Sequence, residues 1–70
     1  MNERELKYAI AAAKEALSHM INRRRWLKNA VVANENYRRA LISRYRIDIL
    51  DLTNEIGKMQ GRLFKLQHGA

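Results

Sequence analysis

Residues 22–46 read NRRRWLKNAVVANENYRRALISRYR, and this stretch decides the fold. Its centre, VVANEN at positions 31–36, joins two β-branched valines to two asparagines, residue types with poor helix propensity. Within residues 16–47, eight arginines and lysines stand against the single acid Glu35, whereas basic and acidic residues balance in the remainder of the chain. This basic segment therefore predicts a break between two helices and a strongly cationic surface beside that break.

The composition favours long helices and self-association. The chain has 70 residues, no Pro and only 3 Gly, so signals for turns and strands are rare. It has no Cys, which excludes disulfides and thiolate metal sites. A core of this size supplies only about 3–5 kcal/mol by itself. We therefore expect a homodimer that buries additional apolar surface.

Apolar residues recur in steps of three and four on both sides of the break, as in coiled coils. We call these two series the heptad stripes. They predict a single all-α domain, an antiparallel hairpin with a helix over about 3–32, a turn at about 33–36 and a helix over about 36–67. The stripes are Leu6, Ile10, Ala13, Leu17, Met20, Arg24, Leu27 and Val31 before the break, and Ile42, Tyr45, Ile49, Leu52, Ile56, Met59, Leu63 and Leu66 after it.

Helix-capping residues agree with this division. Asn2 can cap the first helix, and Asn34 or Asn36 can cap the second, because a side-chain oxygen accepts a free N–H of the first turn. Ion pairs are expected at helical spacing for Glu3–Lys7, Glu35–Arg39 and Glu55–Lys58. The heptad spacing also continues through Val31, Glu35, Arg38 and Ile42, so one helix of about 65 residues, roughly 97 Å long, is an alternative.

Each helix carries a second stripe that one partner helix would not cover. The second stripes are Ala12, Ala16, His19, Arg23, Trp26, Ala30 and Ala33, and then Ser43, Ile47, Leu50, Asn54, Gly57, Gly61 and Phe64. We expect one stripe to pack within the hairpin and the other against a second copy, giving a helical bundle. The residues assigned to the core or the dimer contact are Leu17, Met20, Ile49, Leu52, Ile56, Met59, Leu63 and Phe64.

A turn near Ala33 brings the two basic clusters to one end of the hairpin. Guanidinium groups bind carboxylates and phosphates, and Trp and Tyr anchor interfaces, so this end is a candidate site for a protein partner with an acidic surface. The assigned residues are Arg23, Arg24, Arg25, Trp26, Lys28, Tyr37, Arg38, Arg39, Arg44 and Arg46. Arg24 occupies a heptad core position, and its charge must therefore reach solvent or an acid.

The remaining chemistry-bearing residues do not indicate an enzyme. His19 and His68 are too few for a metal site, and we expect His19 to hydrogen-bond Asp48 or Asp51 across the hairpin. There is no Gly-rich phosphate loop, and Ser18 and Ser43 have no base placed to activate them. We expect no cofactor and no small-molecule substrate. No apolar run approaches the roughly 20 residues of a membrane span, which favours a cytoplasmic protein.

In its size, its basicity and its two heptad stripes, the chain resembles the small accessory proteins with which bacteriophages block host machinery. Among these it is similar to the anti-quorum-sensing type, a short helical dimer that antagonises a LuxR-type transcription activator. The resemblance implies a protein-binding inhibitor that acts in the bacterial cytoplasm. It further implies that the inhibitor occupies the regulator's DNA-binding surface and so prevents operator binding.

Two other functions remain open. Direct nucleic-acid binding would use the arginine cluster to neutralise phosphates. However, the chain lacks the three short helices of a homeodomain and the basic-region-then-zipper order of a bZIP protein. A structural coiled-coil subunit would use the heptad stripes alone, although the second stripes suit a compact bundle better.

Overall fold

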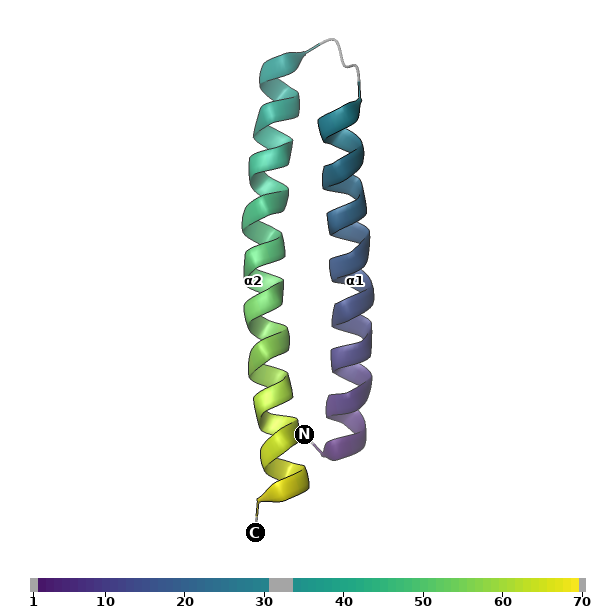
Figure 1. Cartoon of the computed structure of the whole chain (residues 1–70), viewed down its shortest axis with the longest axis vertical. Helices are drawn as coiled ribbons and strands as arrows, with labels where there is room; N and C mark the ends of the chain where they lie inside the picture. The colour runs from purple at the N-terminus through teal and green to yellow at the C-terminus, as the bar shows by residue number, and fades with distance from the viewer. Residues whose placement is uncertain (1, 31–33, 70) are drawn as a thin grey trace.

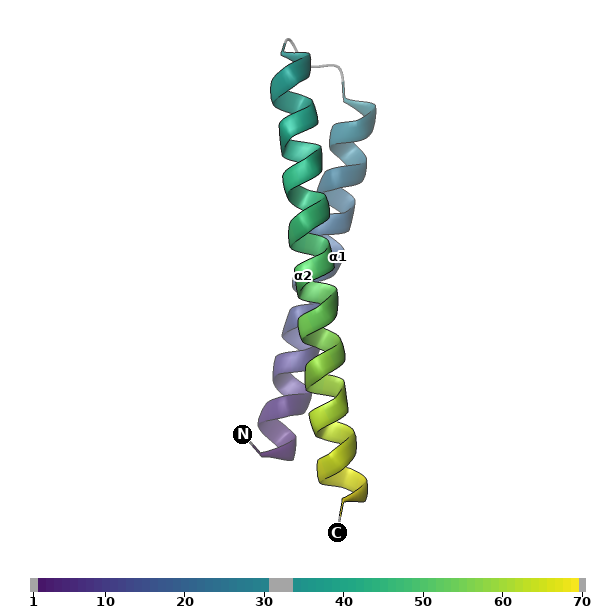
Figure 2. The same cartoon turned by 90° about the vertical axis from the view of Figure 1, so that its left-hand side faces the viewer.

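The computed structural model describes residues 2–30 and 34–69, which form two antiparallel helices, α1 (Glu3–Asn29) and α2 (Glu35–His68) (Figure 1). Both ends of the chain lie at one end of the hairpin, opposite the loop. The helices cross at a shallow angle, as Figure 2 shows. The molecule measures 56 × 15 × 15 Å. A hairpin is therefore confirmed, and the alternative of one straight helix roughly 97 Å long is wrong.

Asparagine side chains cap the N-termini of both helices. Asn2 Oδ1 accepts a hydrogen bond of 2.8 Å from the backbone N–H of Glu5, and the Glu5 carboxylate accepts one of 2.8 Å from Asn2 Nδ2. Asn34 Oδ1 accepts one of 3.0 Å from the N–H of Tyr37. The cap predicted at Asn2 is confirmed, and Asn34 rather than Asn36 caps α2. These bonds satisfy N–H groups that have no acceptor inside the helix.

The end of α1 differs from the sequence prediction. We expected a helix to about residue 32, but α1 ends at Asn29, and Ala30 is extended with ψ of 140°. Side chains satisfy the last carbonyls: Asn29 Nδ2 donates to the Arg25 oxygen at 3.1 Å, and Arg38 reaches across from α2 to the last turn. Residues 31–33, where part of the predicted turn falls, lie outside the described residues. The second helix begins at Glu35 and ends at His68, close to the predicted 36–67.

The heptad stripes face each other and form the core. Leu6, Ile10, Leu27 and Ile56 are buried, with Leu6 only 1% exposed. Most other described stripe residues are half-buried, and these include the predicted core residues Leu17, Met20, Ile49, Leu52, Met59 and Leu63. Leu66, near the open end, is 50% exposed. The heptad spacing therefore identified the contact between α1 and α2 correctly.

Phe64 does not belong to this core. Its side chain is 63% exposed and packs on the ring of His68, with the two ring centroids 4.4 Å apart. The residue stands immediately after the stripe residue Leu63, and a helix turns by about 100° per residue, so Phe64 points away from α1. The core assignment of Phe64 is therefore wrong, whereas its assignment to a dimer contact stays a prediction.

The hairpin leaves much of its surface in water. Its solvent-accessible area is 5702 Å², whereas a compact monomer of 8.2 kDa exposes about 4,500 Å². The cause is geometric, because each of two paired helices covers the other on one side only. Among the described residues, large apolar side chains that stay exposed are Tyr8, Ile21, Trp26, Tyr37, Ile47, Leu50, Phe64 and Leu66.

The three predicted ion pairs are present. Lys7–Glu3 measures 3.2 Å, Arg39–Glu35 3.8 Å and Lys58–Glu55 3.4 Å. All of these side chains are largely exposed, so water and salt screen the attraction. Stability therefore depends on the apolar contact far more than on these pairs.

Truncation of a buried stripe residue should unfold much of the hairpin. Leu27 is 5% exposed, and Leu27→Ala should lower the free energy of unfolding by about 2–5 kcal/mol, through lost apolar burial and the cavity left behind. Leu66→Ala removes the same atoms from a half-exposed site and should cost less than about 1 kcal/mol. Urea denaturation followed by circular dichroism measures both values. Equal losses in the two variants would contradict this account of the core.

Candidate binding surface at the loop end

The fold brings the two basic clusters side by side at the loop end of the hairpin. Arg23 to Lys28 lie in the last turns of α1, and Arg38 to Arg46 lie in the first turns of α2. Most of the residues assigned to partner binding are exposed. Only Arg24 and Arg38 among them are partly buried, and they differ in their hydrogen bonding.

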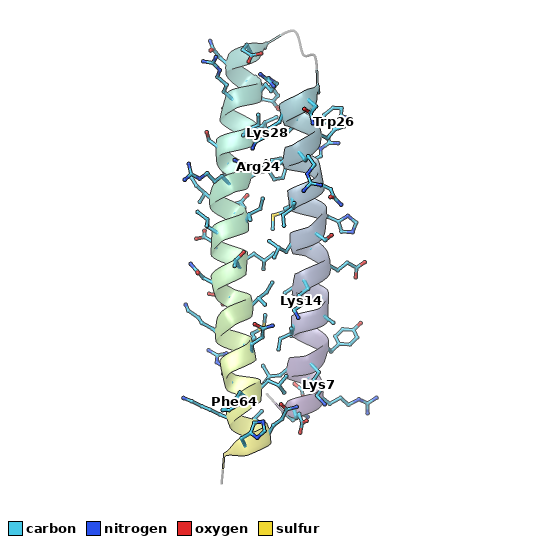
Figure 3. The ribbon with its side chains drawn as sticks, in the orientation of Figure 1. Lys7, Lys14, Arg24, Trp26, Lys28 and Phe64 are labelled. Carbon is cyan, nitrogen blue, oxygen red and sulfur yellow. The ribbon has the colours of Figure 1, made fainter. Side chains whose placement is uncertain are left out.

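A cleft of about 250 Å³ opens beside Arg24 between the two helices. It is lined by Ile21, Arg24, Arg25 and Lys28 of α1 and by Ile49 of α2, and we call it the basic notch. Figure 3 shows Arg24 and Lys28 on the side of α1 that faces α2. Three cationic side chains and two apolar ones line the notch, and no acid is among them. Such a lining fits an anionic group carried on an apolar stem.

The Nε atom of Arg24 is a buried side-chain group that lacks a hydrogen-bond partner among the described residues. A buried polar group without a partner costs free energy, and a charged group costs more than a neutral one. A carboxylate from another molecule, placed in the basic notch, would provide the missing acceptor. No acid pairs with Arg24 within the described part of the hairpin, and the side chain, which is only partly buried, keeps the other predicted route, contact with solvent.

Arg38 is engaged in closing the hairpin. Its Nη1 donates to the Leu27 oxygen at 3.2 Å and to the Lys28 oxygen at 2.9 Å, the carbonyls that the end of α1 leaves free. Its Nε donates to Glu35 Oε2 at 3.2 Å, and its Nη2 forms an ion pair with Glu35 Oε1. All three guanidinium nitrogens are therefore occupied. These contacts give Arg38 a structural role and argue against the partner-binding role predicted for it.

The Arg38–Glu35 pair changes the proton affinity of both groups. The hydrogen bond from Arg38 lowers the pKa of the Glu35 carboxyl below its ordinary value, and the charge of Arg38 adds to this effect. The same hydrogen bond raises the pKa of Arg38. Both side chains are thus held in their charged forms at neutral pH, beside the negative end of the α1 dipole.

The other cations at this end differ in how far they are neutralised. Arg44 lies 3.7 Å from Asp48, and the Arg23 guanidinium stacks 4.8 Å from the centre of the Trp26 ring. Arg25, Lys28 and Arg46 form no ion pair within the described ranges. Two of these three line the basic notch, which is therefore where positive charge is least compensated.

The aromatic side chains at this end are available to a partner. Trp26 is 55% exposed and Tyr37 is 64% exposed, and Figure 3 places Trp26 on the side of α1 away from α2. Trp26 therefore takes no part in the contact between α1 and α2. Tyr45 is half-buried, as its place in the heptad stripe predicts.

The expected contact of His19 is wrong. His19 is exposed, and no hydrogen bond or ion pair in the described structure joins it to Asp48 or Asp51. The acid at position 48 pairs with Arg44 on its own helix instead. The cause is helical phase, since His19 directly precedes the stripe residue Met20 and points away from α2. Among the described residues, no group of three or more His, Cys, Asp or Glu could hold a metal ion.

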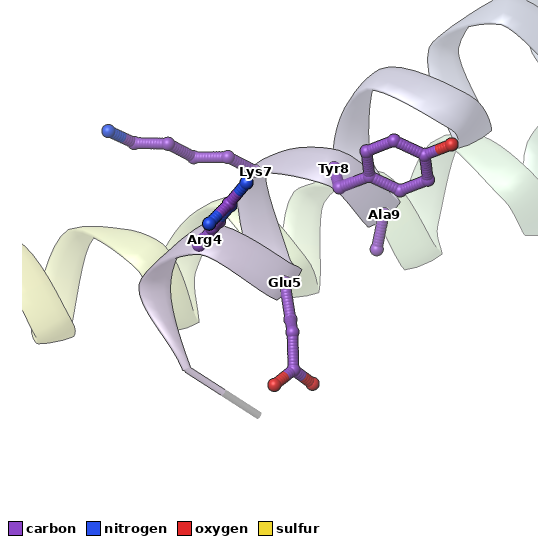
Figure 4. A pocket seen from close by; sticks show the side chains of 5 residues that line it. All are labelled: Arg4, Glu5, Lys7, Tyr8 and Ala9. Carbon is purple, nitrogen blue, oxygen red and sulfur yellow. The ribbon is translucent and has the colours of Figure 1, made fainter.

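A larger hollow, of about 690 Å³, lies on the first two turns of α1 and is lined by Arg4, Glu5, Lys7, Tyr8 and Ala9. All five residues come from one convex helix. Figure 4 shows that the side chains of Glu5, Lys7 and Tyr8 point in different directions, so their polar groups do not converge. This hollow is therefore open surface rather than a binding site.

Sequence reasoning did not foresee the apolar lining of the notch. Ile49 was assigned to the core or the dimer contact and not to partner binding, and Ile21 was assigned to neither stripe. The available signal was helical spacing, because Ile21 stands four residues before Arg25 and seven before Lys28, on the same side of the helix.

No protein-family model, curated protein or solved structure matches this chain. No helix in the described residues has the length and hydropathy needed to cross a bilayer.

The Arg38–Glu35 pair predicts a specific pH dependence of stability. A carboxyl whose pKa is lowered by folding adds stability above its unfolded pKa and loses it as the pH falls through the folded value. Glu35→Gln should therefore destabilise the hairpin at pH 7, and the difference from the parent should shrink as the pH falls through the lowered pKa of Glu35, because protonation makes position 35 neutral in both chains. Thermal unfolding between about pH 7 and pH 2.5 measures this difference.

Arg38→Met is the matched variant for this test. Without the guanidinium, the pKa of Glu35 should return toward its ordinary value, so adding Glu35→Gln to Arg38→Met should change stability little at any pH. A parent–Glu35→Gln difference that stays constant from neutral to acid pH would show that the pair does not stabilise the fold.

Proposed function

We propose that this protein is a non-enzymatic, homodimeric binding protein whose basic notch engages an acidic surface of a protein partner and blocks that partner. The observation that carries the proposal is the notch itself. Arg24, Arg25 and Lys28 meet over two isoleucines with no acid in the lining, and a buried Arg24 nitrogen lacks an acceptor. A surface that only kept the chain dissolved would not need a cleft with this composition.

A glutamate or aspartate side chain of the partner fits the basic notch. Its carboxylate would accept hydrogen bonds from Arg24 and lie between the charges of Arg25 and Lys28, while its methylene groups contact Ile21 and Ile49. Charge-assisted hydrogen bonds contribute about 1.5–3 kcal/mol each when shielded from water. Trp26 and Tyr37 add exposed aromatic surface at the same end, a residue type that often dominates binding energy.

The resemblance to phage inhibitors narrows the partner to transcription regulators of the LuxR type. Binding would then prevent the regulator from reaching its operator. Because a DNA-binding surface is itself basic, the electrostatic fit favours acidic residues that lie within or beside that surface. This form of the proposal rests on the chain's size, basicity and helical pattern.

Charge reversal in the notch tests the proposal. A pull-down from bacterial lysate with the Arg25→Glu/Lys28→Glu variant should recover at least tenfold less of the partner, because each change replaces an attraction with a repulsion. Lys14→Glu is the matched control, an exposed cation on α1 outside the notch, and should recover as much partner as the parent. Unchanged helicity by circular dichroism shows that the variant folds. Equal recovery by parent and variant would refute the proposal.

Direct nucleic-acid binding is the second candidate, and the uncompensated cations beside the exposed Trp26 favour it. If the loop end binds phosphates, fluorescence anisotropy with single- and double-stranded DNA should give an affinity that falls steeply with salt. The protein-partner proposal expects no binding at about 150 mM salt. Retained binding there, lost in Arg25→Glu/Lys28→Glu, would favour the second candidate over the first.

A further inference from the structure

The outer face of α2 carries large apolar residues that stay more than half exposed in the described structure. Ile47, Leu50 and Phe64 are 56%, 55% and 63% exposed. Gly57 and Gly61 lie on the same face, and a methyl group built on either would meet nothing within 4 Å. These glycines are therefore not explained by packing against α1. Glycine also weakens a helix. A close contact with a molecule outside the hairpin would explain why glycine occupies both positions.

The exposed area indicates how much surface such a contact would hide. The hairpin exposes about 1,200 Å² more than a compact protein of its mass. A stable protein–protein interface buries about 800 Å² on each partner. One symmetric interface along a helix would therefore bring this protein close to ordinary burial.

We propose that a second copy of this chain packs on this face, with α2 antiparallel to α2 of the partner. The inference rests on the homodimer proposed above and adds its face and its direction. The spacing along the face supports it: positions 47, 50, 54, 57, 61 and 64 read the same in both directions, as steps of three, four, three, four and three. An antiparallel pair of identical helices needs that symmetry, because each residue meets its counterpart from the opposite end.

The register that follows places large residues against small ones. When the two-fold axis passes between Glu55 and Ile56, Leu50 faces Gly61 of the second copy. Asn54 faces Gly57 of that copy, and the two glycines let the backbones approach closely. At each end of the face, Ile47 meets Phe64 of the second copy, which covers the exposed ring.

Charge selects the antiparallel direction. The net charge of +7 lies within residues 16–47, near the loop end of a hairpin 56 Å long. A parallel dimer would put two such ends together, whereas an antiparallel dimer separates them by several screening lengths of about 8 Å.

The flank of the face agrees with this direction. Arg44, Asp51, Lys58 and Lys65 follow at seven-residue intervals along one flank, and in an antiparallel pair this flank meets itself. Asp51 then lies beside Lys58 of the second copy, twice by symmetry. Arg44 comes near Lys65 of that copy, but Arg44 already pairs with Asp48 at 3.7 Å.

Charge swapping tests face and direction together. Asp51→Lys alone places lysine against lysine in both symmetric pairs, and Lys58→Asp alone places aspartate against aspartate. Each variant should dimerise at least tenfold more weakly than the parent in sedimentation equilibrium. An equimolar mixture pairs lysine with aspartate at both sites, so native mass spectrometry should show a heterodimer with roughly the parent affinity.

Gly61→Leu separates association from folding. Leucine is a much better helix former than glycine, and the site is open in the hairpin, so helicity should stay equal or rise. The added side chain would collide with Leu50 of the second copy and should weaken the dimer at least tenfold. Tight dimerisation of Gly61→Leu would overturn the proposed face.

The other outcomes are equally decisive. A parent dimer whose single charge variants associate normally, or whose mixture forms no heterodimer, would overturn the proposed direction and leave the homodimer itself intact. A parent that stays monomeric at about 100 μM would overturn both. The pull-down tests Arg25 and Lys28 at the loop end and not the outer face of α2. Failure of the partner-binding proposal is therefore distinguished from failure of the dimer proposal.

Discussion

Two paired helices share one contact surface, and this constraint governs the whole molecule. Each helix can turn only one side toward the other, so the buried apolar residues in the described part of the chain are Leu6, Ile10, Leu27 and Ile56. Most of the remaining described stripe residues are only half-buried, because the partner helix covers one side of them and solvent reaches the other. The incomplete burial is thus a consequence of the two-helix architecture. A helix that packs on two sides carries apolar residues on both, as α2 does on its outer face.

The loop end combines this constraint with a concentration of positive charge. Like charges held close together oppose folding, and the hairpin compensates for some of them locally. Glu35 forms ion pairs with Arg38 and Arg39, and Asp48 forms one with Arg44. The free carbonyls at the end of α1 accept hydrogen bonds from the remaining donors of Arg38. Within the described ranges the cations of the basic notch form no ion pair, so the notch presents uncompensated positive charge to a partner.

Features set by spacing along one helix could be predicted from the sequence. The heptad stripes, the Asn2 cap and the i,i+3 and i,i+4 ion pairs depend on residues within one or two turns of each other, and all are present. Predictions that crossed between helices were less successful. The contact of His19 with Asp48 or Asp51 was wrong, and Phe64, assigned to the core or the dimer contact, lies outside the core, because one residue of offset turns a side chain by about 100°.

The sequence by itself determined that the chain is helical, which faces of its helical segments are apolar, and that the excess charge lies within residues 16–47. These properties follow from residue type and local periodicity. Only the tertiary structure decided that Arg38 closes the end of α1, and that Arg24, Arg25 and Lys28 share a cleft with Ile49. The physical reason is that these contacts join residues 10 or more positions apart, and their geometry depends on where α1 ends and how α2 is rotated against it.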